Sequence, residues 1–74
     1  MKNRIEINPA VLGGKPVIKG TRIPVYLILD LIAAGKTIGD ILKEYPTLTE
    51  EDVVAAIEYA SNLLKREEIV ETEV

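Results

Sequence analysis

The chain has 74 residues and a formal net charge of −3, and it contains neither cysteine nor histidine. A chain of this length forms one small domain, which gains little stability from its own core. The missing residues exclude disulfides, the usual zinc sites and the Ser-His or Cys-His pairs of nucleophilic catalysis. The composition therefore predicts a non-enzymatic domain without a cofactor or small-molecule substrate. Oligomerisation is the remaining way to support so small a fold.

No stretch of the chain is apolar for long enough to cross a membrane. The longest uninterrupted run covers residues 25–29, whereas a spanning helix needs about 20 residues. Residues 1–6 lack the continuous apolar stretch of a signal peptide. We expect a cytoplasmic protein with no membrane contact.

The charge is divided unevenly along the chain. Residues 1–36 carry a net charge of +4, and residues 37–74 carry −7. Such asymmetry favours charged partners or head-to-tail contact between subunits.

Residues 1–24 have the pattern of a short β element. Residues 5–7 belong to a stretch that alternates polar and apolar side chains, as a half-buried strand does. Residues 17–23 predict a hairpin, with Lys19-Gly20 as its turn because glycine readily supplies a positive φ. We expect the strand at 5–7 to pair with this hairpin, since two strands alone are marginally stable.

Residues 25–66 predict three helices, at 25–34, 38–44 and 50–65. Pro24 is placed for the first turn of the first helix, and Gly35 for its end. Thr37 and Thr49 each precede an aspartate by three residues, as in a capping box. In the third helix we expect an apolar stripe, formed by Val53, Ile57, Ala60 and Leu64 and widened by Val54, Ala56 and Leu63. Residues 67–74 form an acidic tail that could be frayed helix, strand or disordered.

The predicted fold is thus mainly α: a three-helix bundle with helix-turn-helix layout behind a short strand and hairpin, in a single domain over residues 1–74. The third helix would be the DNA recognition helix of such a layout. Its first residues are Glu50, Glu51 and Asp52, which phosphates would repel. The favoured interpretation is that these acids cap the helix, where its dipole stabilises negative charge.

Three cations near the hairpin are candidate nucleic-acid contacts: Lys15, Lys19 and Arg22. Lys2 and Arg4 could extend this basic patch. The alternative is a solvated hairpin in which Arg22 pairs with a carboxylate of the helical half. Gly13-Gly14-Lys15 does not match a phosphate-binding loop, because Pro9 and Pro16 stand where such a loop needs Gly and Ser or Thr.

Two further segments are candidate protein contacts. The helix at 25–34 is apolar nearly all round, which predicts burial on more than one side and a homodimer through Tyr26, Leu27 and Leu31. The tail carries acidic and apolar residues that could dock on a basic partner: Glu67, Glu68, Ile69, Val70 and Glu71. A simple solvated end is the alternative for the tail.

The string GGKPVIKGTRIPV at residues 13–25 resembles the family numbered 433 among the domains of unknown function, whose members are described as predicted antitoxins. The likeness covers about residues 5–66. It implies a homeodomain-like helical fold and the antitoxin role of a toxin–antitoxin pair, with a small nuclease-like toxin of the PIN-related kind as partner. The family's signature residues carry no established roles and fall here on Gly14, Lys15, Pro16, Gly20, Thr21 and Arg22.

The leading hypothesis is therefore an antitoxin that binds its toxin through the acidic back half and regulates its own operon. One alternative is a DNA-binding transcriptional regulator that uses the basic hairpin patch. The other is a structural homodimeric subunit.

Overall fold

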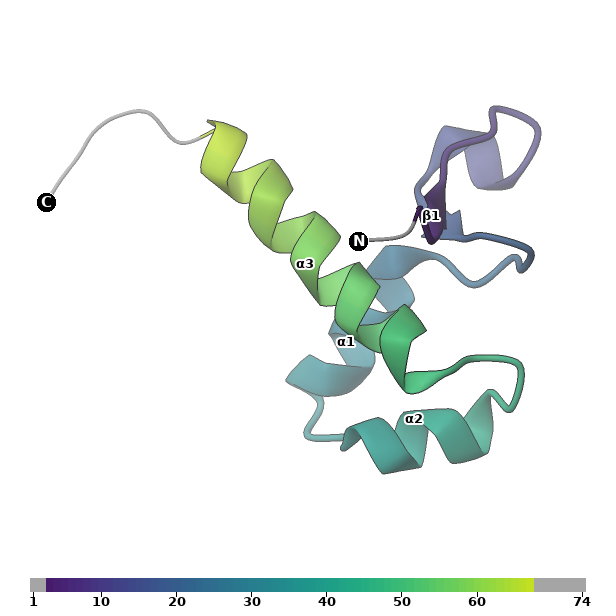
Figure 1. The fold of residues 1–74 in the computed structure, drawn as a ribbon, viewed down its shortest axis with the longest axis vertical. Helices are drawn as coiled ribbons and strands as arrows, with labels where there is room; N and C mark the ends of the chain where they lie inside the picture. The colour runs from purple at the N-terminus through teal and green to yellow at the C-terminus, as the bar shows by residue number, and fades with distance from the viewer. Residues whose placement is uncertain (1–2, 68–74) are drawn as a thin grey trace, which may run out of the picture.

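The computed structural model describes residues 3–67, which form a small β element followed by three helices (Figure 1). In chain order the elements are β1 (Ile5–Glu6), a 3-10 turn (Leu12–Gly14), β2 (Val17–Ile18), α1 (Val25–Ala33), α2 (Ile38–Glu44) and α3 (Glu50–Glu67). In the view of Figure 1, α3 crosses in front of α1 and α2 lies below both. The predicted fold, a mainly helical bundle behind a short β element, is confirmed.

The β element is held by antiparallel pairing on both sides of β2. On one side β1 pairs with β2, with Ile5 opposite Ile18. On the other side Val17 bridges to Pro24, and the Ile18 N–H donates to the carbonyl of Ile23 at 2.9 Å. The expected contact between residues 5–7 and the hairpin is therefore present, although β1 itself has only two residues.

The hairpin turns at Lys19-Gly20, as the sequence predicts. The Thr21 N–H donates to the Ile18 carbonyl at 2.9 Å across the turn, and Gly20 has a φ of 81°. The Thr21 hydroxyl donates to the same carbonyl at 2.7 Å and accepts from the Ile23 N–H at 3.0 Å. Thr21 thus fixes the hairpin locally.

We expect Gly20→Ala to lower the free energy of unfolding by about 1 to 2 kcal/mol, because alanine resists a positive φ. A Cβ at this position would have no atom within 4 Å, so the cost is one of backbone conformation alone. Gly39 is the matched control. It lies inside α2 with its nearest contact, Thr37 Oγ1, at 3.7 Å from a Cβ. Gly39→Ala should raise stability by about 0.5 kcal/mol. Urea denaturation of both variants tests this pair, and equal effects would contradict it.

A second left-handed turn precedes β2 and was not anticipated from the sequence. Leu12, Gly13 and Gly14 have φ values of 52°, 65° and 88°. The Gly14 N–H donates to the Val11 carbonyl at 3.0 Å. The Gly-Gly pair was the available signal, since glycine adopts a positive φ without steric cost, whereas Leu12 adopts it at a cost. The turn brings Pro16 beside α1, where its carbonyl accepts from the Val25 N–H at 2.9 Å.

The helix bounds agree with prediction to within two residues. Residues 38–44 match α2, α1 ends at Ala33 and α3 runs on to Glu67. Pro24 is the N-cap of α1, with ψ of 152°, and so precedes the first turn instead of lying in it. Its extended backbone still suits proline, and it also completes the bridge to Val17.

The capping box predicted at the start of α2 is present. The Asp40 N–H donates to Thr37 Oγ1 at 3.0 Å, and the Thr37 N–H donates to Asp40 Oδ2 at 2.9 Å. The bond from the Thr37 backbone is the main cause of a lowered pKa of the Asp40 carboxyl. Because the folded-state pKa is lowered, this cap stabilises the fold above the ordinary carboxyl pKa and is lost as the pH falls through the lowered value.

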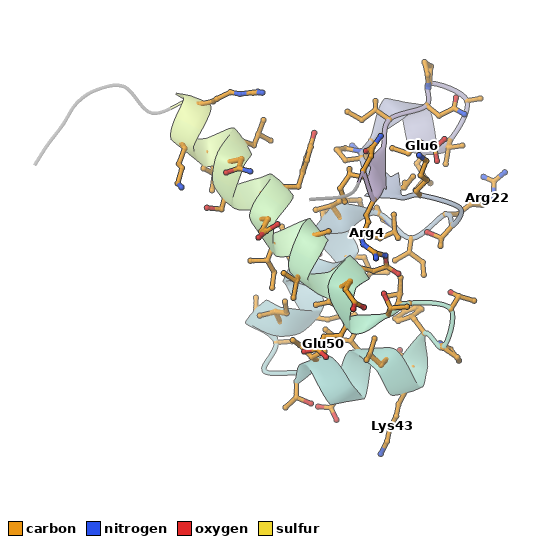
Figure 2. The ribbon with its side chains drawn as sticks, in the orientation of Figure 1. Arg4, Glu6, Arg22, Lys43 and Glu50 are labelled. Carbon is orange, nitrogen blue, oxygen red and sulfur yellow. The ribbon has the colours of Figure 1, made fainter. Side chains whose placement is uncertain are left out.

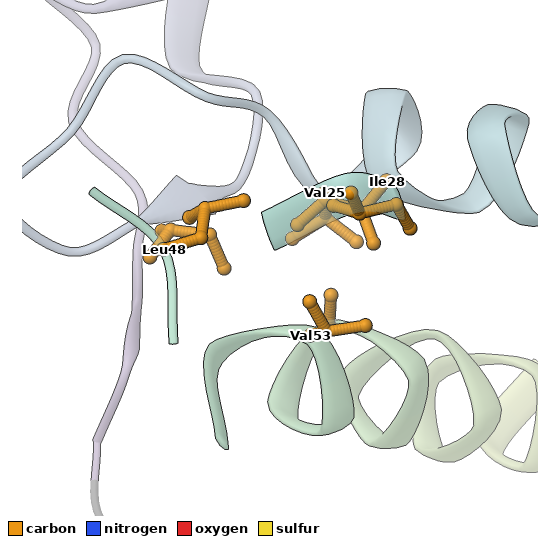
Figure 3. Packing of buried hydrophobic residues seen from close by; sticks show 7 residues of the cluster. Val25, Ile28, Leu48 and Val53 are labelled. Carbon is orange, nitrogen blue, oxygen red and sulfur yellow. The ribbon is translucent and has the colours of Figure 1, made fainter. Parts of the chain in front are cut away.

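One apolar core joins the β element to all three helices. Its buried members are Ile18, Val25, Ile28, Ile41, Leu48, Val53 and Ala56. Figure 3 shows Val53 of α3 directed toward Val25 and Ile28 of α1. Ile28 and Val53 have no exposed surface, so the α1–α3 contact is the centre of the domain.

Candidate protein-interaction surface

The described part of the chain holds no concentration of side chains suited to metal binding. Among residues 3–67 no group of three or more His, Cys, Asp or Glu residues is placed to hold an ion. The charged and apolar surfaces of these residues are the remaining candidates for a site.

Arg4 is engaged with the helical half and does not join a basic patch. Its Nη1 donates to Asp52 Oδ1 at 3.0 Å, and Figure 2 shows the Arg4 side chain beside the start of α3. The two residues are 48 positions apart, so no local pattern in the sequence could show this pair. The expectation that Arg4 extends the hairpin patch is replaced by a structural ion pair that ties the N-terminal strand to α3.

Asp52 is also the acid of the second capping box. Its Oδ2 accepts from the Thr49 N–H at 3.0 Å, and its own N–H donates to Thr49 Oγ1 at 3.2 Å. Glu50 and Glu51 occupy the same first turn of α3 and are exposed. The capping role expected for these acids is thus fulfilled by Asp52, while Glu50 and Glu51 remain on the surface.

Lys15, Lys19 and Arg22 are all exposed, but they do not line one common hollow. Lys15 borders a hollow between α1 and α3, whereas Arg22 borders a different one beside Val11 and Thr47. In Figure 2 the Arg22 side chain points away from the helices. Within residues 3–67 the only ion pair joins Arg4 to Asp52, so the alternative pairing of Arg22 with a carboxylate is not found there. DNA binding by these cations stays a prediction.

A hollow of about 270 Å³ lies between the start of α1 and the second half of α3. Pro16, Val25, Tyr26 and Leu29 form one wall, Tyr59, Ala60 and Leu63 the other, and Lys15 is the charged residue on its rim. Tyr26 and Leu63 are 51% and 42% exposed. Aromatic and aliphatic side chains left open in this way are typical of protein-binding surfaces.

The apolar stripe predicted on α3 is divided between the core and the surface. Val53 and Ala56 are buried, whereas Ile57 and Leu64, on the outward flank of the helix, are 41% and 67% exposed. In Figure 1 the last turns of α3 extend beyond the other helices.

The residues proposed for a homodimer occupy different environments on α1. Tyr26 is exposed, while Leu27 and Leu31 are half-buried, and Leu31 packs against the core. Of the proposed tail contacts, Glu67 is the last residue of α3 and its side chain is not described. Glu68, Ile69, Val70 and Glu71 lie outside the described residues.

The signature residues expected from the family resemblance cluster in the β element and mainly shape its turns. Gly14 and Gly20 have positive φ, and Thr21 bonds across the hairpin turn. Through Pro16 the same element is bonded to the start of α1, beside the apolar hollow.

None of the helices described over residues 3–67 is long and apolar enough to cross a membrane.

Residues 5–60 match the model of the family described as "Protein of unknown function (DUF433)", and the chain belongs to this family. It is 42% identical over 53 residues to the uncharacterized protein y4eO of Sinorhizobium fredii (strain NBRC 101917 / NGR234), a match that covers 72% of this chain and 24% of that protein. It is also similar to the crystal structure of a DUF433 member from Anabaena variabilis ATCC 29413, with a TM-score of 0.81 and 37% identity. That match covers 88% of this chain and 64% of the other. The chain thus spans about a quarter of the length of y4eO and just under two thirds of the crystallised protein.

Proposed function

We propose that this chain is a non-enzymatic antitoxin that binds a small nuclease-like toxin and regulates its own operon. The observation that carries a protein-binding role is the apolar hollow between α1 and α3. Its walls leave Tyr26 and Leu63 about half exposed. The antitoxin role itself comes from the family resemblance of residues 13–25.

The hollow has the composition of a protein contact. Two tyrosines, Tyr26 and Tyr59, stand on opposite walls, and tyrosine is among the residues that contribute most to binding at interfaces. The hollow is open and almost wholly apolar, so a large apolar side chain of the toxin fits it better than a charged substrate does.

The acidic tail adds an electrostatic component to this proposal. Residues 67–71 begin at the last residue of α3 and contain three glutamates, Glu67, Glu68 and Glu71. A nuclease has a cationic groove for nucleic acid, which attracts an acidic segment and speeds the encounter. Apolar contacts in the hollow would then slow dissociation.

Co-expression with the product of the neighbouring open reading frame tests the proposal. We expect a complex to copurify, and Leu63→Glu to weaken it at least tenfold, because a charge enters the apolar contact. Ile7→Glu is the matched control, since Ile7 is an exposed isoleucine that does not line the hollow. Removal of residues 68–74 should slow association. Failure to copurify, or equal effects of the Leu63 and Ile7 variants, would overturn the proposal.

A further inference from the structure

A second apolar surface runs along the outward flank of α3 and is distinct from the hollow. Val54, Ile57 and Leu64 are 38%, 41% and 67% exposed, and Ser61 is exposed between them. These four residues are spaced by three, four and three positions, which is the a/d spacing of a helix that packs lengthwise against another helix. The residues of α3 that line the hollow, Tyr59, Ala60 and Leu63, occupy other positions of the heptad.

We propose that this flank binds the same flank of α3 from a second copy of the chain, with the two helices antiparallel. In such a pair Val54 lies opposite Leu64 of the second copy, and Ile57 lies opposite its Ser61. Each layer then combines a larger side chain with a smaller one. A parallel pair would instead place Ser61 against Ser61 and leave a gap beside Ile57, which packs less well.

The charges of α3 also select the antiparallel orientation. Its first turn carries the exposed acids Glu50 and Glu51, and its last turns carry the exposed cations Lys65 and Arg66. Antiparallel pairing brings the acidic end of each helix to the basic end of the other, and in this register Glu51 lies near Lys65 of the second copy. Parallel pairing would bring like charges together at both ends.

One residue opposes the pairing and provides a test with a distinctive sign. Glu58 lies near the centre of the stripe, on the flanking position next to Ile57, so the two-fold axis brings it close to Glu58 of the second copy. Two like charges at the centre are repelled. Removing this charge should therefore strengthen the dimer. If the dimer formed through another surface, the same substitution would not strengthen it.

The stripe spans only two heptads, so the dimer is a weak one. Interfaces below about 1,200 Å² belong to transient complexes, and association should appear only as the protein concentration is raised. The proposal does not depend on the antitoxin function, because it rests on Val54, Ile57 and Leu64, none of which lines the hollow.

Sedimentation equilibrium of the full chain over a concentration series measures the dimer dissociation constant. We expect reversible dimers, with Ile57→Asp raising the dissociation constant about 100-fold and Glu51→Lys raising it three- to tenfold. Adding Lys65→Glu to Glu51→Lys should restore the original value, because the pair reforms with its charges exchanged. Glu58→Gln should lower the dissociation constant.

Glu44→Lys is the matched control, because it makes the same charge change on an exposed residue of α2. It should leave the dissociation constant unchanged. Circular dichroism verifies that each variant is folded. A chain that stays monomeric at every concentration would overturn the proposal. So would a dimer that is indifferent to Ile57→Asp, or a double variant that associates no better than Glu51→Lys alone.

Discussion

Replacing Ile28 with alanine is expected to lower the free energy of unfolding by about 3 to 4 kcal/mol. Ile28 has no exposed surface and belongs to the core cluster where α1 meets α3. Alanine would remove three carbons from a site enclosed by three helices and β2, which cannot collapse to fill the space. A domain of this size has only a few kcal/mol of net stability, so the variant should be largely unfolded at room temperature.

Two further variants distinguish the loss of core packing at Ile28 from the loss of an apolar side chain at an exposed position. Ile28→Val should cost about 1 kcal/mol, because it removes one methyl group. Ile7→Ala should change the stability by less than about 0.5 kcal/mol, since Ile7 is 58% exposed. Thermal and urea unfolding followed by circular dichroism measure all three variants. Comparable losses at Ile28 and Ile7 would show that the core does not lie where α1 meets α3.

Those parts of the fold that depend on local chemistry could be predicted from the sequence. The hairpin turn needs a residue that accepts positive φ, and Gly20 supplies it. The starts of α2 and α3 need a side-chain acceptor and an acid three residues later, which Thr37 with Asp40 and Thr49 with Asp52 provide. Each of these features involves residues a few positions apart, so the sequence itself shows them.

Features that depend on distant parts of the chain could not be predicted. The sequence suggested Arg4 as an extension of the basic hairpin patch, because its partner, Asp52, is 48 positions away and no local pattern joins the two. The spacing in α3 showed a helix with a broad apolar stripe. It could not show that α1 and α2 cover only the Val53–Ala56 side and leave Ile57 and Leu64 open. The candidate surface depends on how the helices pack against one another, so the sequence pattern alone could not show it.

The second large effect is expected at Asp52, where one carboxylate serves two roles. It closes the capping box of α3 by accepting the Thr49 N–H at 3.0 Å, and it pairs with Arg4 at 3.0 Å while only 8% exposed. Asp52→Ala should lower the free energy of unfolding by about 2 to 3 kcal/mol, because it removes the carboxylate half of the capping box and leaves the Arg4 guanidinium and the Thr49 N–H without their acceptor. Asp52→Asn keeps an oxygen for the Thr49 N–H and should cost about half as much.

A double-mutant cycle with Arg4→Met isolates the contribution of the ion pair itself. The Arg4 side chain is 34% exposed, so solvent screens the pair, and we expect a coupling energy of about 1 kcal/mol. The effect of Asp40→Ala in the exposed capping box of α2 should be smaller than that of Asp52→Ala, because Asp40 has no partner from another element among residues 3–67. A coupling energy near zero would mean that Arg4 does not hold β1 to α3. Equal losses at Asp40 and Asp52 would mean that capping alone accounts for the stability that Asp52 provides.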